Sequence, residues 1–330
     1  MHATPFAFSN GAARRGFLQL ICMVSEGTAE IRVNTATSVI AAVLTDAPQR
    51  RMTCLGGRDG MRRSLGSLLA GLVALFLGTT FRATRKLDIA APCSSYFCSR
   101  IAVSPDGSTL LTSCCDQTWA GIYARCLAAP SADPRVVLDI AWPGQLSVSD
   151  DGFVFIADTK NCMVHVLTPH LTYYGTVGAG QLDDLGGVCA NRDVVAVTET
   201  STRRVSVFRR SDGALLYRFG SELVHPLCIC VMAAHCRFVV ADEYHVSLFT
   251  VTGELVGHVG AEVKMFPMSV ACSRFDELFV ATLESEIMMF DATGALLRSF
   301  CGFDGLCLGI ALCDGAVFMQ MASMYIRVLM

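Results

Sequence analysis

The chain has 330 residues, of which 26 are Lys or Arg and 29 are Asp or Glu, so its formal net charge is −3. The charge is unevenly distributed: residues 1–82 carry nine Arg against four acidic residues, a net of +5, whereas the rest has 17 basic and 25 acidic residues, a net of −8. Because affinity for a phosphate backbone comes chiefly from Lys and Arg, this acidic part is not expected to bind nucleic acid.

Residues 1–60 precede a second methionine, Met61, which two arginines follow in the layout of a signal sequence's positively charged start. We interpret residues 1–60 as a disordered or gene-model extension and leave open whether the protein starts at Met1 or Met61. The first 25 residues contain two arginines and no acidic residue, a composition that a mitochondrial presequence shares. A mitochondrial location is therefore an alternative.

Ser64–Phe81 is a run of 18 residues without a charge, bordered by arginines on both sides and barely long enough to span a bilayer. We interpret residues 61–84 as a signal-anchor or a secretory signal sequence. The anchor is favoured because Phe81 would occupy the minus-three position of a cut after Ala83, where a small residue is needed. A buried helix packed on the following domain is another alternative. We expect a single-pass membrane protein with its C-terminal domain on the non-cytosolic side, or else a protein of the secretory pathway.

The remainder, residues 85–330, is built of repeats about 41 residues long: Phe208, Phe249 and Phe290 stand 41 residues apart, as do Pro226 and Pro267. A unit of this length cannot bury its own apolar face and must stack against copies of itself. Each unit contains four short runs rich in β-branched and aromatic residues, separated by Asp, Asn, Ser, Thr or Gly, which predicts four strands. In three successive units the predicted strands are 185–190, 194–198, 204–208 and 214–219; 229–232, 238–241, 246–249 and 255–259; 270–272, 278–281, 287–290 and 296–300.

An earlier unit covers residues 145–177, and a degenerate one covers 101–127. The last unit supplies only three runs before Met330, and residues 86–91 are predicted to add the fourth, because Leu87–Pro92 echoes Leu138–Pro143, where a fourth strand is expected. Such closure would remove exposed sheet edges. The prediction is an all-β fold, a six-bladed β-propeller of four-stranded blades over residues 85–330, preceded by an N-terminal extension with one hydrophobic segment.

Ala157–Leu167, preceded by Val148–Ile156, resembles the NHL repeat, whose pattern combines an Asp-Gly turn, an Asp after the second strand and a Gly-bounded hairpin. Degraded copies follow at Val197–Phe208 and Ala241–Phe249, and the last two units have Thr282 and Gln320 in place of the Asp. The resemblance covers about three quarters of the chain and implies a six-bladed propeller. It implies little about function, because the family includes scaffolds, RNA-binding proteins, ubiquitin-ligase adaptors and enzymes. For Asp158 and Asp242 we expect carboxylates that satisfy backbone donors of turns.

The predicted innermost strands contain no Asp, Glu or His, and only Asn191 offers a hard oxygen ligand of the kind a tunnel calcium site needs. We therefore expect no enzyme, no metal and no cofactor, with a tunnel hydrolase or lyase as the alternative. The 16 Cys include no Cys-x-x-Cys pair and fall mostly in or beside strands, where they are read as packing residues, with a few disulfides left open. A ubiquitin-ligase adaptor is disfavoured by the lack of a RING-type Cys/His array.

Loops on a rigid scaffold are where binding residues collect. The loops between second and third strands are predicted to project from one rim, and an exposed aromatic beside arginines is a combination enriched among residues that dominate interfaces. We predict a monomeric scaffold that binds a protein or peptide at this rim, with RNA binding or ubiquitin-ligase adaptation as alternatives. The predicted binding residues are Lys160, Arg203, Arg204, Asp242, Tyr244 and His245.

Overall fold

The computed structural model describes residues 100–329 except 116–119, 131, 264, 302, 304, 314–315 and 323–324. The predictions for residues 1–60, for the hydrophobic segment Ser64–Phe81 and for a closing strand at 86–91 concern residues outside this range. No helix within the described part of the chain is long and apolar enough to span a membrane.

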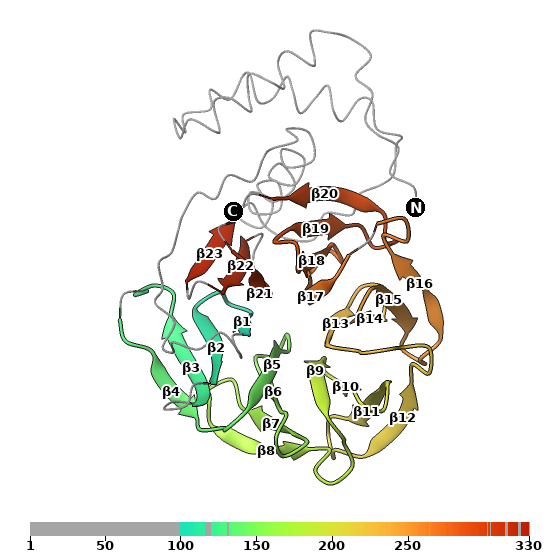
Figure 1. Cartoon of the computed structure of the whole chain (residues 1–330). Coiled ribbons are helices and arrows are strands. Elements are labelled where there is room, and N and C mark those ends of the chain that lie inside the picture. Colours follow the sequence, from blue (N-terminus) through green and yellow to red (C-terminus); the bar gives the residue numbers. More distant parts are fainter. Residues whose placement is uncertain are drawn as a thin grey trace, which may run out of the picture. The chain divides into compact units, whose positions relative to one another are not determined.

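The described residues form six antiparallel sheets arranged as blades around a central axis (Figure 1). The strands are β1 (Ile101–Val103), β2 (Thr109–Cys115), β3 (Ala120–Cys126) and β4 (Arg135–Leu138) in blade 1; β5 (Pro143–Val148), β6 (Val154–Asp158), β7 (Met163–Leu167) and β8 (Tyr173–Val177) in blade 2; β9 (Leu185–Ala190), β10 (Val194–Glu199), β11 (Arg204–Arg209) and β12 (Leu215–Phe219) in blade 3; β13 (Cys228–Met232), β14 (Arg237–Ala241), β15 (Val246–Thr250) and β16 (Leu255–Val259) in blade 4; β17 (Pro267–Cys272), β18 (Leu278–Thr282), β19 (Ile287–Phe290) and β20 (Leu296–Phe300) in blade 5; β21 (Cys307–Cys313), β22 (Ala316–Met321) and β23 (Ile326–Leu329) in blade 6.

The first strand of each blade is the innermost, and each of these strands contacts the innermost strand of the next blade. The contact of β21 with β1 completes the ring, which confirms the predicted six-bladed propeller. Blades 1 to 5 have four strands, and three strands of blade 6 lie within the described residues.

The fourth strand of blade 1 was expected near Leu138–Pro143, but β4 ends at Leu138 and Pro143 already begins β5. Pro143 has no backbone N–H, and the first position of a strand is one of the few places in a sheet that tolerates proline. Residues 139–142 therefore connect blade 1 to blade 2.

The 41-residue spacing of the phenylalanines reflects packing between blades. Phe208, Phe249 and Phe290 stand at equivalent positions of β11, β15 and β19, and all three are fully buried. Each belongs to a separate apolar cluster that joins its blade to a neighbouring one, as Phe208 packs with Phe155 and Val164 of blade 2. Full burial of such a side chain contributes about 1.5–3 kcal/mol, so the repeated Phe helps to fix blades 2 to 5 against one another.

Glycines at the repeat ends take conformations that side chains rarely adopt. Gly220, after β12, has a φ of +95°, and a Cβ there would lie 2.6 Å from the Leu223 side chain. Gly253 and Gly294 have φ values of +88° in the turns between third and fourth strands, as predicted. The recurring glycines are therefore required by the turns and not by a ligand.

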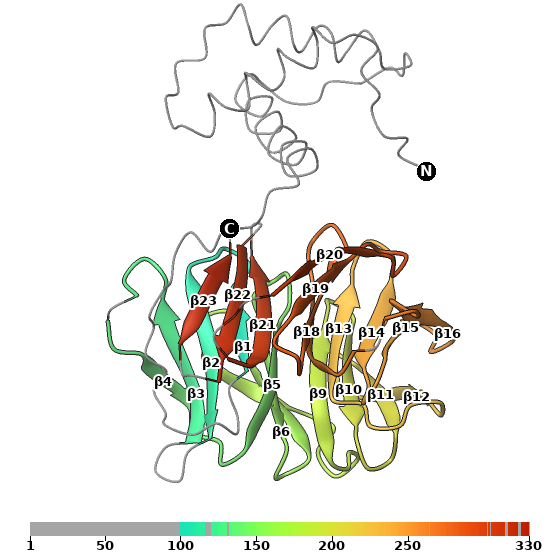
Figure 2. The ribbon, with the colours of Figure 1, turned by 45° about the horizontal axis from the view of Figure 1, so that its top comes forward.

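The antiparallel strand order places two sets of loops at opposite ends of the blades (Figure 2). One end carries the loops between second and third strands together with the connections from one blade to the next, and we call it the connection rim. The other end carries the loops between first and second and between third and fourth strands, and we call it the hairpin rim.

Candidate functional site

Polar side chains on the innermost strands are bound by the protein's own backbone. Gln145 of β5 accepts a hydrogen bond from the Ile229 N–H at 3.2 Å and donates one to the Ile229 carbonyl at 2.9 Å, so it reaches from blade 2 to blade 4. Arg100, directly before β1, donates to the carbonyls of Met268 and Leu308. In the described residues no three His, Cys, Asp or Glu side chains converge in a geometry that could hold a metal ion.

Three of the six cysteines on the innermost strands are buried packing residues, whereas Cys230, Cys272 and Cys313 are half-buried. Cys189, Cys228 and Cys307 are buried and free. Burial raises the pKa of the Cys189 thiol far above its ordinary value and that of the Cys307 thiol to about 12, so both stay protonated and unreactive. Cys114 takes part in a disulfide bond.

The repeated carboxylates at the ends of the second strands hold loops of the connection rim in place. Asp242 is buried and accepts hydrogen bonds from the backbone N–H groups of Val224, at 2.8 Å, and of His225. Asp158 accepts from the Asn161 N–H at 3.1 Å and lies 3.1 Å from Nε2 of His165. The expectation that these carboxylates satisfy backbone donors is confirmed, and the Asp242 carboxylate is occupied within the protein.

Glu199 stands at the equivalent position of blade 3 and is fully buried, a role that the sequence prediction missed although the repeat alignment points to it. It pairs with Arg204 through two hydrogen bonds of 2.9 and 3.0 Å and accepts a third from Ser206. Burial works to raise the pKa of the Glu199 carboxyl, but the hydrogen bonds from Arg204 and Ser206 and the charge of Arg204 hold that pKa below its ordinary value. Arg204 is therefore engaged, while the adjacent Arg203 is exposed.

The other predicted residues are exposed on the connection rim but belong to different blades. Lys160 lies in the β6–β7 loop of blade 2, and Tyr244 and His245 lie in the β14–β15 loop of blade 4. The His245 ring centroid is 5.3 Å from that of His258 on β16. The Tyr244 ring contacts the exposed ring of Phe266.

Four large apolar side chains form an exposed patch that crosses blades 3 to 5 on the connection rim, and we call it the apolar arc: Val224, Tyr244, Phe266 and Leu283. Their exposed fractions lie between 41% and 52%. The rings of Tyr244 and Phe266 meet edge to face with centroids 5.5 Å apart, and the Leu283 N–H donates to the Phe266 carbonyl at 2.9 Å. Val224 is tied through its N–H to Asp242, two residues before Tyr244.

Acidic residues border the apolar arc. Each of the segments that carry it also carries a glutamate, namely Glu222, Glu243, Glu262 and Glu284. The arc and its border are formed by the segments 200–203, 220–226, 242–245, 260–266 and 283–286. Together these segments contain six acidic and two basic residues, a net charge of −4. A hydrogen bond with Glu243 and the negative charge of Glu243 raise the pKa of the Tyr244 hydroxyl.

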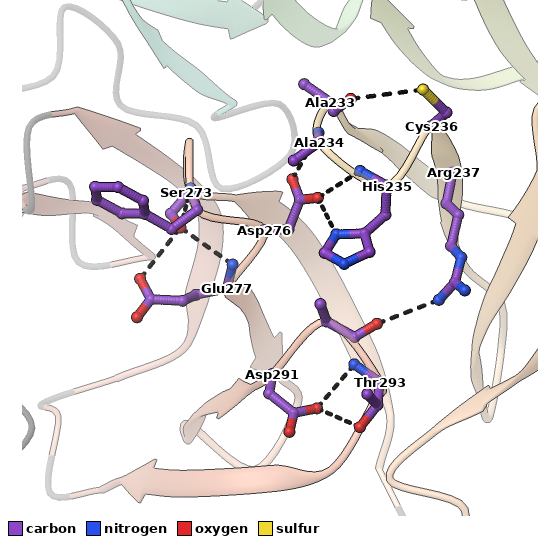
Figure 3. A network of polar contacts seen from close by, with 12 residues as sticks. Ala233, Ala234, His235, Cys236, Arg237, Ser273, Asp276, Glu277, Asp291 and Thr293 are labelled. Atoms are coloured by element: carbon purple, nitrogen blue, oxygen red, sulfur yellow. Dashed lines mark hydrogen bonds and ion pairs between the residues drawn. The ribbon is translucent and has the colours of Figure 1, made fainter. Parts of the chain in front are cut away.

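The hairpin rim carries a network that joins blades 4 and 5 (Figure 3). Asp276 is fully buried and accepts hydrogen bonds from the His235 N–H at 2.8 Å and from Nδ1 of the same residue. Nearby, Asp291 caps its own turn by accepting from the Thr293 N–H at 2.8 Å and from the Thr293 hydroxyl. These polar groups are satisfied within the protein, so the network fastens two blades together.

A cavity of about 300 Å³ lies on the hairpin rim between blades 1 and 2, and three of its lining residues are Asp106, Asp150 and Asp151. Hydrogen bonds from Ser104 and Ser108 lower the pKa of Asp106 to about 2. Asp151 is held by Arg210, whose Nη2 lies 2.7 Å from its Oδ2. Two of the three carboxylates are thus engaged by neighbouring side chains.

Comparisons with known proteins bear on the fold. No protein-family model matches the chain, and no curated protein matches it. Among solved structures, a chain in the crystal structure of a nidogen/laminin complex is similar with a TM-score of 0.55 and 14% sequence identity. The match covers 64% of this chain and 83% of that one. An identity this low supports the propeller fold alone.

Proposed function

We propose that this chain is a non-catalytic protein-interaction scaffold whose binding surface is the connection rim, centred on the apolar arc. The observation that carries the proposal is the exposure of Val224, Tyr244, Phe266 and Leu283 on neighbouring segments of one rim, with the rings of Tyr244 and Phe266 in contact. Exposed apolar patches with a polar border are typical of protein-binding surfaces. The structurally similar chain comes from a complex of two proteins, nidogen and laminin, which is in keeping with a binding role for a propeller of this kind.

The finer part of the proposal is that the propeller is of the NHL-repeat type and is tethered to a membrane through Ser64–Phe81. The Asp positions after the second strands support the first point, because Asp158 and Asp242 both accept hydrogen bonds from backbone N–H groups of the connection rim. The uncharged run of 18 residues supports the second. The disulfide at Cys114 favours a compartment outside the cytosol, where disulfides persist.

The proposal is tested by capture of partners from cells that express the full chain. We expect proteins that co-purify with the wild type to be lost from a Tyr244→Ser, Phe266→Ser variant. A Phe275→Ser variant, which changes an aromatic residue 70% exposed on the hairpin rim, is the matched control and should retain them. The same capture experiment is carried out a second time on cell lysate treated with nuclease.

Partners that disappear on nuclease treatment would favour the RNA-binding alternative. Partners that the Tyr244→Ser, Phe266→Ser variant retains would place the interaction surface elsewhere. Tethering is tested separately by carbonate extraction of membranes, where release of the chain into the supernatant would contradict it.

A further inference from the structure

We propose that the apolar arc and its acidic border bind a positively charged segment of another protein, in which apolar anchors alternate with arginine side chains. This inference rests on the proposed function and specifies the chemistry of the partner. Its basis is the juxtaposition of Val224, Tyr244, Phe266 and Leu283 with Glu222, Glu243, Glu262 and Glu284 on the same segments of the rim.

The first step of the argument is the spacing of charges along the arc. Glu243 directly precedes Tyr244, Glu284 directly follows Leu283, and Glu222 lies two residues before Val224. An occupant that covers the apolar side chains therefore comes within reach of several carboxylates at once. Desolvated carboxylates without a partner are costly, so a neutral or acidic occupant would pay a penalty that a basic one avoids.

The second step is the presence of aromatic faces beside those carboxylates. Tyr244 and Phe266 meet edge to face, are 47% and 41% exposed, and leave ring surface available to a partner. A guanidinium group can stack on an aromatic face while it donates hydrogen bonds to a carboxylate, and a compact ammonium group does this less well. Arginine is therefore the basic residue that this surface fits best.

The third step is the exclusion of other occupants by charge. The segments that form the arc and its border have a net charge of −4, and residues 83–330 as a whole have a net charge of −8. Phosphate backbones and anionic lipid surfaces would be repelled by such a surface. A basic protein segment gains from the same field, which raises its association rate at low ionic strength.

The test uses the purified full chain in detergent and synthetic peptides of about 12 residues that carry the same Leu and Phe anchors, flanked by Arg, Ser or Glu. Binding is measured by fluorescence anisotropy. The arc variant is Tyr244→Ser, Phe266→Ser, Leu283→Ser, and the border variant is Glu222→Gln, Glu243→Gln, Glu262→Gln, Glu284→Gln. Matched controls on the hairpin rim are Phe275→Ser with Val251→Ser, and Glu254→Gln. Melting curves verify that each variant is folded.

We expect the Arg-flanked peptide to bind the wild type at least about ten-fold more tightly than the Ser-flanked one. Both the arc variant and the border variant should lose this preference, and the hairpin-rim controls should keep it. Because the attraction is partly electrostatic, the affinity should fall between about 50 and 500 mM NaCl.

Equal binding of Arg-flanked and Ser-flanked peptides, or a border variant that binds like the wild type, would overturn the inference while leaving the arc as a protein-binding surface. No binding of the Arg-flanked peptide to the wild type would also overturn it, and the capture experiment would still decide the proposed function. Concentration-dependent self-association that only the arc variant abolishes would identify the occupant as a second copy of this chain, and would contradict the inference as well.

Discussion

The side chain of Gln145 occupies the space that a side chain at Gly187 would need. Gln145 extends from β5 in blade 2 to Ile229 in blade 4, and a Cβ on Gly187 of blade 3 would clash with its Oε1 atom and approach the Ile229 nitrogen to 3.2 Å. One glycine in blade 3 therefore lets one glutamine connect the blades on either side of it.

Replacement of Gly187 by Ala should destabilise the propeller by about 1–3 kcal/mol, because the new methyl group displaces Gln145 from Ile229. The measurement is the free energy of unfolding in urea. Gly175→Ala, which adds a Cβ with no atom within 4 Å, is the matched control and should have little effect. The effects of Gly187→Ala and Gln145→Ala should be less than additive, and full additivity would show that the two residues do not interact.

The free energy of unfolding should decrease as the pH is lowered through and below 4.5, the ordinary pKa of a Glu carboxyl. The reason is that the pKa of Glu199 in the folded state is held below that value. A carboxyl with a lowered pKa stabilises the fold above its unfolded-state pKa, and this contribution is lost when the folded state takes up the proton. Arg204→Ala removes the nearest positive charge from a buried carboxylate and should cost about 3 kcal/mol at neutral pH. Glu199→Gln should give a shallower loss of stability in acid than the wild type, and an identical acid profile would rule out Glu199 as a contributor.

Phe249→Ala should destabilise the protein by about 3–5 kcal/mol, since it opens a cavity in the cluster that joins blades 3 and 4. Leu255→Ala on the outer strand β16, where the side chain is 43% exposed, should cost much less. Thermal and urea unfolding monitored by circular dichroism compare the two. Similar losses for both variants would mean that the 41-residue Phe repeat does not mark the core.

Alkylation of the native protein should separate the cysteines by burial. Cys126 and Cys236 are exposed and should react with iodoacetamide as fast in the native protein as in the unfolded one. Cys189 and Cys307 should react only after unfolding, because burial raises the pKa of both thiols. Mass spectrometry of the digested protein identifies the labelled residues. Rapid labelling of Cys189 in the native protein would show that the innermost strands are open to solvent.

The sequence predicted the propeller because its signals are local and repeated. Phe208, Phe249 and Phe290 recur at a fixed spacing, and Gly253 and Gly294 mark turns that need a positive φ. Short alternating runs between such turns specify strands without reference to any distant residue. The expectation for Asp158 was confirmed for the same reason, since its carboxylate meets the Asn161 N–H of its own turn. Asp242 also accepts from backbone N–H groups, but these belong to the connection between blades 3 and 4.

What only the tertiary structure decided is which residues share a surface and which are already occupied. Arg203 and Arg204 are adjacent in sequence, yet Arg203 is exposed whereas Arg204 pairs with the buried Glu199. Phe266 and Leu283 come from different segments and join Tyr244 only because the blades are stacked side by side. Burial and contact between blades depend on the whole ring, so no periodicity within one unit contains that information.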